Sequence, residues 1–493
     1  MKFYIYTKVL TLLDSFLYPS AVRALLVFSL MFLPFLTAEA QSKGEDSSTS
    51  LSLSTFGDNK LSLFENNKTL FASSIDNEGS IDQRTIDPKK QFNDHAGPNL
   101  SLVEMIDQLK AHNPQLEQAR KNYLAAKAIA PQVLAPNNPQ LGIVNNPTTG
   151  NPITLDHSQF FYYTLTQSFP FPGKKRLPAQ IAEDQAEMIN SQTESLYLQL
   201  VNQLKINFYQ LLLLQRQYNI NQETIQRLEQ IKEISKVRYS QNAAAYVDYL
   251  NAQVAKSSAE NDQFGVERQI ETSRQTLNTL VGRDPGTPLI ITGDISEQTL
   301  TDKTLLELEN LALEHNPNVK ASTLQVEAAK KSIDLANLAY YPDFNVILYF
   351  NSTNPPIGYT NLSSYGTEFD IVFPLWFNRK EKYGVIQANA TLEASQASDL
   401  SIRQQLRLAV DSAYNALSQA VNQTQFIKNH QIVEAKTAYR LALTNYSSGG
   451  AGFIDLLTSQ NNFRISELGL AQSEISAIQA YANLVAALGT EIH

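Results

Sequence analysis

The fold is decided by the stretch FYYTLTQSFP, residues 161–170, which recurs in altered form as YGTEFDIVFP at residues 365–374. Side chains alternate in character along both copies; in the second, apolar residues fall on one face and the acids Glu368 and Asp370 on the other. A period of two with many aromatic residues predicts β-strands. Each copy leads into about sixty residues without Gly or Pro, at 179–242 and 385–448, which predicts a very long helix. The same strand-to-helix transition is therefore present twice.

Other landmarks recur in the same order, at a spacing that grows from about 203 to about 207 residues. The recurring pairs are His112 with His315, Asn113 with Asn316, Tyr239 with Tyr446, Asp248 with Asp455, Gln253 with Gln460 and Gly282 with Gly489. Solenoid repeats are only about 20–50 residues long. The chain is therefore a tandem duplication of one large unit, with repeat one at 98–283, a linker at 284–303 and repeat two at 304–493.

Each repeat is expected to contain an opening helix, two strands, a long helix, a turn and a closing helix. The opening helices cover about 101–130 and 304–339, and an Asn-Pro pair in each kinks or restarts the helix. The long helices extend about 90 Å at 1.5 Å per residue. Apolar residues recur in them with 4-3 spacing, as at Leu204, Phe208 and Leu211, which is typical of a helix-packing seam. The fold class is mainly α with a small β part.

The four strands have two interpretations, which the strand pattern alone does not separate: a soluble sheet packed on helices, or part of a transmembrane barrel. No stretch after residue 40 is long and apolar enough for a spanning helix, so only strands are available for membrane insertion. Membrane barrels need at least about eight strands. If the strands insert, the chain must therefore share its barrel with copies of itself.

The first 97 residues read as export and tail segments. Basic residues, a short apolar run at 24–36 and the sequence Ala38-Glu39-Ala40 predict a signal peptide at 1–40. The Ser-rich stretch 41–97 has little apolar surface to bury and is predicted to be a disordered tail.

Composition excludes several classes of function. The chain has no Cys, which rules out disulfides and Cys-ligated metals, and its net charge of −9 argues against a nucleic-acid partner. The six His residues show no metal-ligand spacing, and neither a phosphate-binding loop nor a nucleophile elbow is present. We therefore expect no catalytic residues, no metal site and no cofactor: the protein is not an enzyme.

Two sets of motifs resemble those of TolC-like outer-membrane efflux factors. One is QSFPFPGKKR at 167–176, between a strand and a long helix; the other joins Arg238-Tyr239 to DYLNAQ at 248–253 and recurs as Asn445-Tyr446 to Gln460. The resemblance covers about 100–489, and the first motif is similar to the branch that serves heavy-metal exporters. It implies a homotrimeric outer-membrane β-barrel, with four strands per chain, on a long α-helical periplasmic tunnel.

The resemblance also implies the function and the partners. Such proteins form the outer-membrane channel of tripartite efflux or type I secretion systems. They are docked by a periplasmic adaptor and fed by an inner-membrane pump of the RND or ABC type, and outer-membrane lipid surrounds the barrel. The alternative is a soluble periplasmic coiled-coil adaptor or scaffold, which would use the helices without needing amphipathic strands.

Candidate pore-gate residues follow from the same resemblance. Asp455 matches an inward-facing aspartate at the closed tunnel end, where three copies would form a cation-attracting ring. The resemblance also implies a contact between the positions of Asp248 and Tyr446. Gly449 and Gly450 make the second turn flexible and suit a hinge. The alternative is that both aspartates simply favour a helix N-terminus and that the glycines satisfy turn geometry.

Basic residues gather where strands give way to helices. The candidates are Lys174, Lys175, Arg176, Arg379 and Lys380. They form either a collar that meets anionic lipid head groups at the membrane boundary or a solvated turn. Trp376 nearby is either part of an interfacial aromatic girdle or local core.

Overall fold

The computed structural model describes residues 99–147, 158–293, 303–353 and 363–490. The chain divides at Lys90, and all the described residues lie in the second unit, Gln91–His493. The predicted signal peptide at 1–40 and tail at 41–97 lie outside the described residues. All features below belong to the second unit.

The elements of this unit occur twice in the same order. The first series is α5 (Leu102–His112), α6 (Pro114–Lys127), α7 (Ile129–Leu134), β2 (Gln140–Pro147), β3 (Ser158–Phe169), α8 (Arg176–Ser240) and α9 (Tyr246–Leu280). The second is α10 (Leu305–His315), α11 (Pro317–Leu338), β5 (Asp343–Thr353), β6 (Ser363–Val372), α12 (Glu381–Phe426), α13 (Ile432–Ser448) and α14 (Phe453–Leu488). The predicted mainly α fold is confirmed.

The Asn-Pro pairs restart the opening helices, as the sequence predicts. Asn113 lies between α5 and α6, with its side-chain oxygen accepting from the Leu116 N–H, and Pro114 takes the first helical position. Asn316 caps α11 in the same way through Asn318. A proline at that position costs no hydrogen bond, because the first N–H groups of a helix have no partner within the helix.

The same two asparagines bind the far end of their own repeat. Asn113 Nδ2 donates to the Leu280 carbonyl at 2.8 Å, and Asn316 Nδ2 donates to the Ala487 carbonyl at 2.9 Å. Gly282 follows at φ 76°, and a Cβ there would lie 2.4 Å from the His112 carbonyl oxygen. The recurring Asn and Gly therefore close each repeat at one point, where the carbonyls at a helix end would otherwise lack a partner.

The two long helices differ. Helix α8 is continuous over 65 residues. Its counterpart is broken by a π-helix, Ile427–Gln431, in which the Ile432 N–H donates to the Ile427 carbonyl five residues back. The very long second helix that the absence of Gly and Pro predicts is confirmed from Glu381 to Ser448, with one π-helical turn inside it that the sequence does not predict, since a π-helix needs neither residue.

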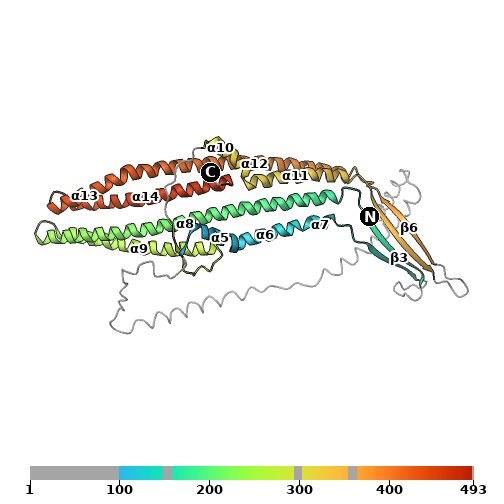
Figure 1. Cartoon of the computed structure of the whole chain (residues 1–493), viewed down its shortest axis with the longest axis horizontal. Coiled ribbons are helices and arrows are strands. Elements are labelled where there is room, and N and C mark those ends of the chain that lie inside the picture. Colours follow the sequence, from blue (N-terminus) through green and yellow to red (C-terminus); the bar gives the residue numbers. More distant parts are fainter. Residues whose placement is uncertain (1–98, 148–157, 294–302, 354–362, 491–493) are drawn as a thin grey trace, which may run out of the picture. The chain divides into compact units, whose positions relative to one another are not determined.

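Each repeat buries its own apolar seam. Leu204, Phe208 and Leu211 of α8 are buried in the first, and Val410 and Leu417 of α12 in the second. Two further clusters combine residues of both repeats, along α8, α9, α13 and α14. Figure 1 shows α8 alongside α9 toward one end and alongside α5, α6 and α7 toward the sheet. Because the two further clusters combine residues along helices of both repeats, the repeats pack lengthwise against each other.

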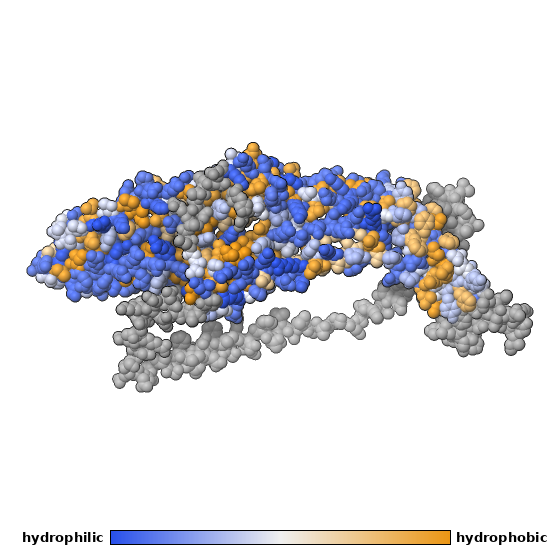
Figure 2. Space-filling view, viewed as in Figure 1, coloured by the Kyte–Doolittle hydropathy of each residue, from blue (hydrophilic) through white to orange (hydrophobic). Residues whose placement is uncertain are grey.

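The four long strands form one antiparallel sheet in the order β2-β3-β5-β6. Their register places Tyr163 opposite Phe350 and Phe350 opposite Tyr365. The exposed large apolar residues of that face are Leu141, Ile143, Tyr163, Leu165, Phe169, Phe344, Leu348, Phe350, Tyr365, Phe369 and Ile371. The opposite face is mostly polar and includes Glu368 and Asp370. The alternation that the sequence predicts is thus present, and Figure 2 shows hydrophobic residues over the sheet.

The structure also contains a short strand pair that the sequence does not predict. A short parallel pair joins β1 (Asn99–Leu100) to β4 (Ile290–Ile291), which brings the start of repeat one beside the linker that follows it. Within the described residues, none of the helices combines the length and apolar character needed to cross a bilayer.

Candidate functional site

The helix tips opposite the sheet carry most of the candidate gate residues. The α8–α9 turn contains Asn242 with φ 56°, and the α13–α14 turn begins at Gly449 with φ 91°. Asn242 thus adopts a left-handed conformation, which asparagine tolerates better than most residues. Gly449 caps α13, whereas Gly450 follows without a positive φ and donates its N–H to the Asn445 carbonyl at 2.7 Å.

Tyr446 is the best-buried of the candidates, with 1% of its surface exposed. Its hydroxyl lies 3.1 Å from Ser235 Oγ on α8 and donates to Asp248 Oδ2 on α9 at 3.4 Å. Arg238 lies over the ring, 4.4 Å from its centroid, and also donates to the Tyr446 carbonyl oxygen. One side chain of repeat two is therefore held by three side chains of repeat one.

Burial sets the protonation of this tyrosine. Loss of hydration raises the pKa of the Tyr446 phenol, the Ser235 hydrogen bond partly opposes that shift, and the negative charge of Asp248 adds to it. The neutral phenol is the form that donates a hydrogen bond to the Asp248 carboxylate. The contact between the repeats is therefore fully formed at neutral pH.

The two candidate aspartates lie in different surroundings. Asp248, in the first turn of α9, is half-buried against Tyr446. Asp455 is exposed in the first turn of α14, and a Cβ at Gly452 would meet its Oδ2 at 3.1 Å. The Asp455 carboxylate thus lies back toward the helix N-terminus, where its charge is favourable. Both interpretations of Asp455 fit this position, since the side chain is also open to solvent.

The repeat is asymmetric at this point. Tyr239, which corresponds to Tyr446, is 47% exposed and lies 5.2 Å from the ring of Tyr246. Residue Asn445 stands where repeat one has Arg238, 207 positions earlier. Repeat one therefore presents its tyrosine to solvent, whereas repeat two buries it against repeat one.

The candidate basic residues at the junction of sheet and helices divide into two groups. Lys174 is bound: its Nζ donates to Asp343 Oδ1 at 2.9 Å and to the Tyr341 carbonyl at 2.8 Å. Lys175 is half-buried, and Arg176, Arg379 and Lys380 are exposed. Lys174 thus ties repeat one to repeat two, while Arg176, Arg379 and Lys380 are open to solvent.

Trp376, adjacent to this junction, is 70% exposed, so the local-core interpretation is wrong. It lines a cavity of about 860 Å³ between α11, α12 and the end of β6, together with Leu335, Phe373 and Lys380.

Sequence reasoning missed Ser235 and Arg238 as contacts of Tyr446. Ser235 lies four residues before Tyr239, one helical turn away on the same face of α8. Arg238 stands next to Tyr239 in the sequence. Neither the spacing of Ser235 nor the position of Arg238 shows that these residues contact Tyr446. Only the packing of α13 against the first helix pair identifies these contacts.

The chain resembles known proteins in its family pattern, its sequence and its fold. The outer membrane efflux protein family model matches residues 105–283 and 308–490. Toxin and drug export protein A of Aggregatibacter actinomycetemcomitans is 24% identical over 346 residues, which cover 68% of this chain and 73% of that protein. An uncharacterised Haemophilus influenzae protein is 25% identical over 293 residues.

The match to the Haemophilus protein spans 58% of this chain and 63% of that protein. The solved structure of the outer membrane protein VceC from Vibrio cholerae has a TM-score of 0.65 at 18% identity, covering 79% of this chain and 96% of that one. This likeness shows the fold, which is that of solved outer-membrane channels.

Proposed function

Because the chain belongs to the outer membrane efflux protein family, we propose that it is the outer-membrane channel of a tripartite efflux or type I secretion system. It conducts substrates that an inner-membrane pump and a periplasmic adaptor deliver, and releases them outside the cell.

One observation carries the proposal: the sheet at one end of the long helices (Figure 1) has an exposed apolar face and a mostly polar face. Strands of about 9–11 residues cross a bilayer when tilted, and β3, β5 and β6 have 12, 11 and 10 residues. Apolar side chains facing out and polar ones facing in are the pattern of a membrane barrel. A face of exposed Phe, Tyr, Leu and Ile would otherwise be costly in water.

The sheet also supports a homotrimer. Its outer strands are β2 and β6, and the exposed N–H and C=O groups of an edge strand have no partner in lipid. Four strands are too few to close a barrel. Three copies joined edge to edge supply twelve, and the helices of the three copies then line one tunnel.

The gate lies at the far ends of these helices. Tyr446 and Asp248 connect the two hairpins, Gly449 and Gly450 form the second turn, and the contacts of Tyr446 hold the α13–α14 hairpin against α8 and α9. Three Asp455 carboxylates around the axis attract cations at the narrowest point. Opening requires the second hairpin to leave the first.

The adaptor is expected to dock on the α8–α9 tip. This tip exposes the neighbouring rings of Tyr239 and Tyr246, together with Val247. Aromatic residues are enriched at protein interfaces. The channel itself performs no chemistry, so the energy for transport comes from the pump.

At the other end, Arg176, Arg379 and Lys380 lie where the sheet meets the helices. We assign them to the periplasmic face of the membrane, against anionic head groups, with Trp376 in the interfacial region. The cleavable signal peptide at 1–40 directs the chain out of the cytoplasm.

Reconstitution of the purified full chain in planar lipid bilayers tests the proposal. We expect stepwise ionic currents and a detergent-extracted trimer that fractionates with outer membranes. A monomer that is soluble without detergent and passes no current would instead support the periplasmic adaptor or scaffold.

A further inference from the structure

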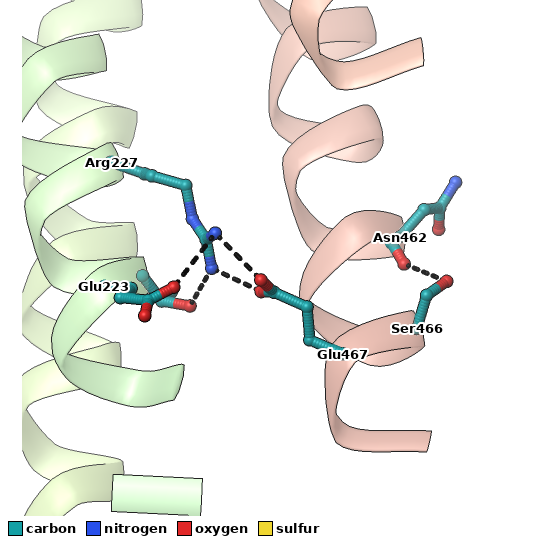
Figure 3. Close-up of polar contacts among 6 residues, drawn as sticks. Glu223, Arg227, Asn462, Ser466 and Glu467 are labelled. Carbon is teal, nitrogen blue, oxygen red and sulfur yellow. Dashed lines mark hydrogen bonds and ion pairs between the residues drawn. The ribbon is translucent and has the colours of Figure 1, made fainter. Parts of the chain in front are cut away.

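A second contact between the repeats lies well above the tip. Arg227 of α8 faces Glu467 of α14, with Nη1 3.2 Å from Oε1 and Nη2 2.6 Å from Oε2 (Figure 3). The side chains are 15% and 14% exposed. A paired, nearly buried geometry of this kind is the strong form of an ion pair, because both charges are satisfied at once.

Aromatic rings hold this pair in place. Arg227 lies 4.8 Å from the centroid of the Phe463 ring, and Phe463 stacks on Tyr439 of α13 at 5.9 Å. Thr224 Oγ1 accepts a further hydrogen bond from Arg227 Nη2 at 3.1 Å. The guanidinium group therefore contacts Glu467 and Phe463 of α14, and Phe463 in turn contacts Tyr439 of α13.

The second hairpin has two weak points at the same level. The π-helix Ile427–Gln431 is joined to α14 by the Gln431–Ser466 hydrogen bond of 3.4 Å. Gly469 lies two residues beyond Glu467, inside α14. A Cβ there would lie 4.0 Å from Ile427 Cδ1, an ordinary contact, so packing does not require this glycine. Glycine and a π-helix both lower the stiffness of a helix.

The first hairpin has a charged connection of its own at a similar height. Glu229 of α8 binds Lys256 of α9 at 2.9 Å and Lys232 at 2.6 Å. The Glu229–Lys256 contact joins α8 to α9 within repeat one, whereas Lys232 lies on α8 itself. The first hairpin is therefore a frame, to which the second is attached at Tyr446 and again at Glu467.

We propose that Arg227 and Glu467 are positioning residues that fix the pivot of the gate. Arg227 lies about 13 residues before the end of α8 and Glu467 about 14 after the start of α14, so both are about 20 Å from the tip. The part of the second hairpin below this level, 432–466, moves, and the π-helix together with the α14 segment from Glu467 to Gly469 forms the hinge. The part above it stays on the frame. This inference rests on the proposed channel function.

Three variants of the full chain separate this role from simple packing. Glu467→Gln removes the charge but keeps the shape, and it is expected to raise the open fraction in planar bilayers about tenfold, since it leaves the buried Arg227 only the longer 3.8 Å ionic contact with Glu223 of its own helix. Gly469→Ala, which the structure accommodates, is expected to stiffen α14 and lower the open fraction. The matched control is Glu260→Gln, 207 positions before Glu467, whose partner Lys256 lies on its own helix at 3.3 Å. It is expected to leave the open fraction unchanged.

Amide hydrogen exchange of the trimer supplies a readout that does not depend on current. In Glu467→Gln we expect exchange about tenfold faster within 432–466 and unchanged within 470–488. Equal acceleration on both sides, or the same effect in Glu260→Gln, would show a general packing role and overturn the pivot. So would an open fraction that Glu467→Gln and Gly469→Ala leave unchanged. A wild-type chain that passes no current would refute the channel, while the exchange pattern would still decide the pivot.

Discussion

Arg238 lies over the ring of Tyr446, 4.4 Å from its centroid, and the duplicated sequence does not repeat this relationship. The corresponding residues, Asn445 and Tyr239, cannot form it, because asparagine carries no charge and Tyr239 faces solvent. Duplication supplied two equivalent hairpins, and asymmetric contacts such as this one make the first hairpin the support of the second.

Removing the charged partner of Tyr446 is expected to loosen the tip. Arg238→Met should raise the open fraction in planar bilayers about tenfold, because a hydrogen bond to a charged group contributes about 1.5–3 kcal/mol and tenfold corresponds to about 1.4 kcal/mol. The matched control is Tyr239→Phe, at the exposed equivalent of Tyr446, which should conduct as the wild type does. Equal currents from wild type and Arg238→Met would mean that the contact does not hold the gate.

The protonation of Tyr446 gives a pH dependence with a definite sign. Its folded-state pKa is raised by burial, so the neutral phenol stabilises the tip fully below the ordinary tyrosine pKa of about 10. That stability is lost as pH rises through the raised folded-state pKa. The difference in tyrosinate absorbance between wild type and Tyr446→Phe should therefore appear only above about pH 10. A difference that develops below this pH would contradict the burial of the phenol.

The sequence predicts the features that depend on residues only a few positions apart in the chain. Alternation places Phe369 and Asp370 on opposite faces of β6, and Asn113-Pro114 restarts a helix, because each depends on residues a few positions apart. The stacking of Phe463 on Tyr439 and the pairing of Arg227 with Glu467 join distant parts of the chain. No local signal distinguishes Arg227 from a solvated arginine on a long helix.

The π-helix is a second kind of feature that sequence patterns do not reveal. The segment IKNHQ contains neither Gly nor Pro, and its residues fit an α-helix. Its conformation reflects the packing of Ile427, which is buried, and of Gln431 against Ser466. Tertiary contacts therefore outweigh local propensity at this point.

Asp455 is expected to set the affinity of the tunnel end for cations. Asp455→Asn should weaken block by divalent or trivalent cations about tenfold, because it removes all three charges from the trimer while preserving shape. Asp334→Asn serves as control, since Asp334 is an exposed carboxylate on α11. If both variants are blocked as strongly as the wild type, Asp455 acts only at the helix N-terminus.

The basic residues at the sheet–helix junction are expected to separate by function. The double variant Arg379→Gln and Lys380→Gln should reduce binding to vesicles that contain anionic lipid, by about 1 kcal/mol per residue. Lys174→Gln should leave this binding unchanged and lower stability, because Lys174 is paired with Asp343 across the repeats. Vesicle co-sedimentation and urea unfolding measure the two effects. Loss of lipid binding in Lys174→Gln alone would reverse the assignment.

Asn113 tests how each repeat is closed. It supplies two hydrogen bonds: Oδ1 caps α6 through the Leu116 N–H, and Nδ2 satisfies the Leu280 carbonyl at the end of α9. Asn113→Ala should lower the free energy of unfolding by about 1–3 kcal/mol, since it removes the cap and leaves a partly buried carbonyl without its partner. Asn113→Asp keeps the acceptor and loses only the donor, so it should be intermediate.

The control for this series is Asn207→Ala, because Asn207 Nδ2 donates to the Gln203 carbonyl of its own helix. A change within about 0.5 kcal/mol is expected there, as for most substitutions outside a cap or core. Urea unfolding followed by circular dichroism gives all three values. If Asn113→Ala unfolds at the wild-type midpoint, the recurring Asn-Pro pair serves only to restart the helix, and the closure of the repeat depends on Gly282 and the apolar seam.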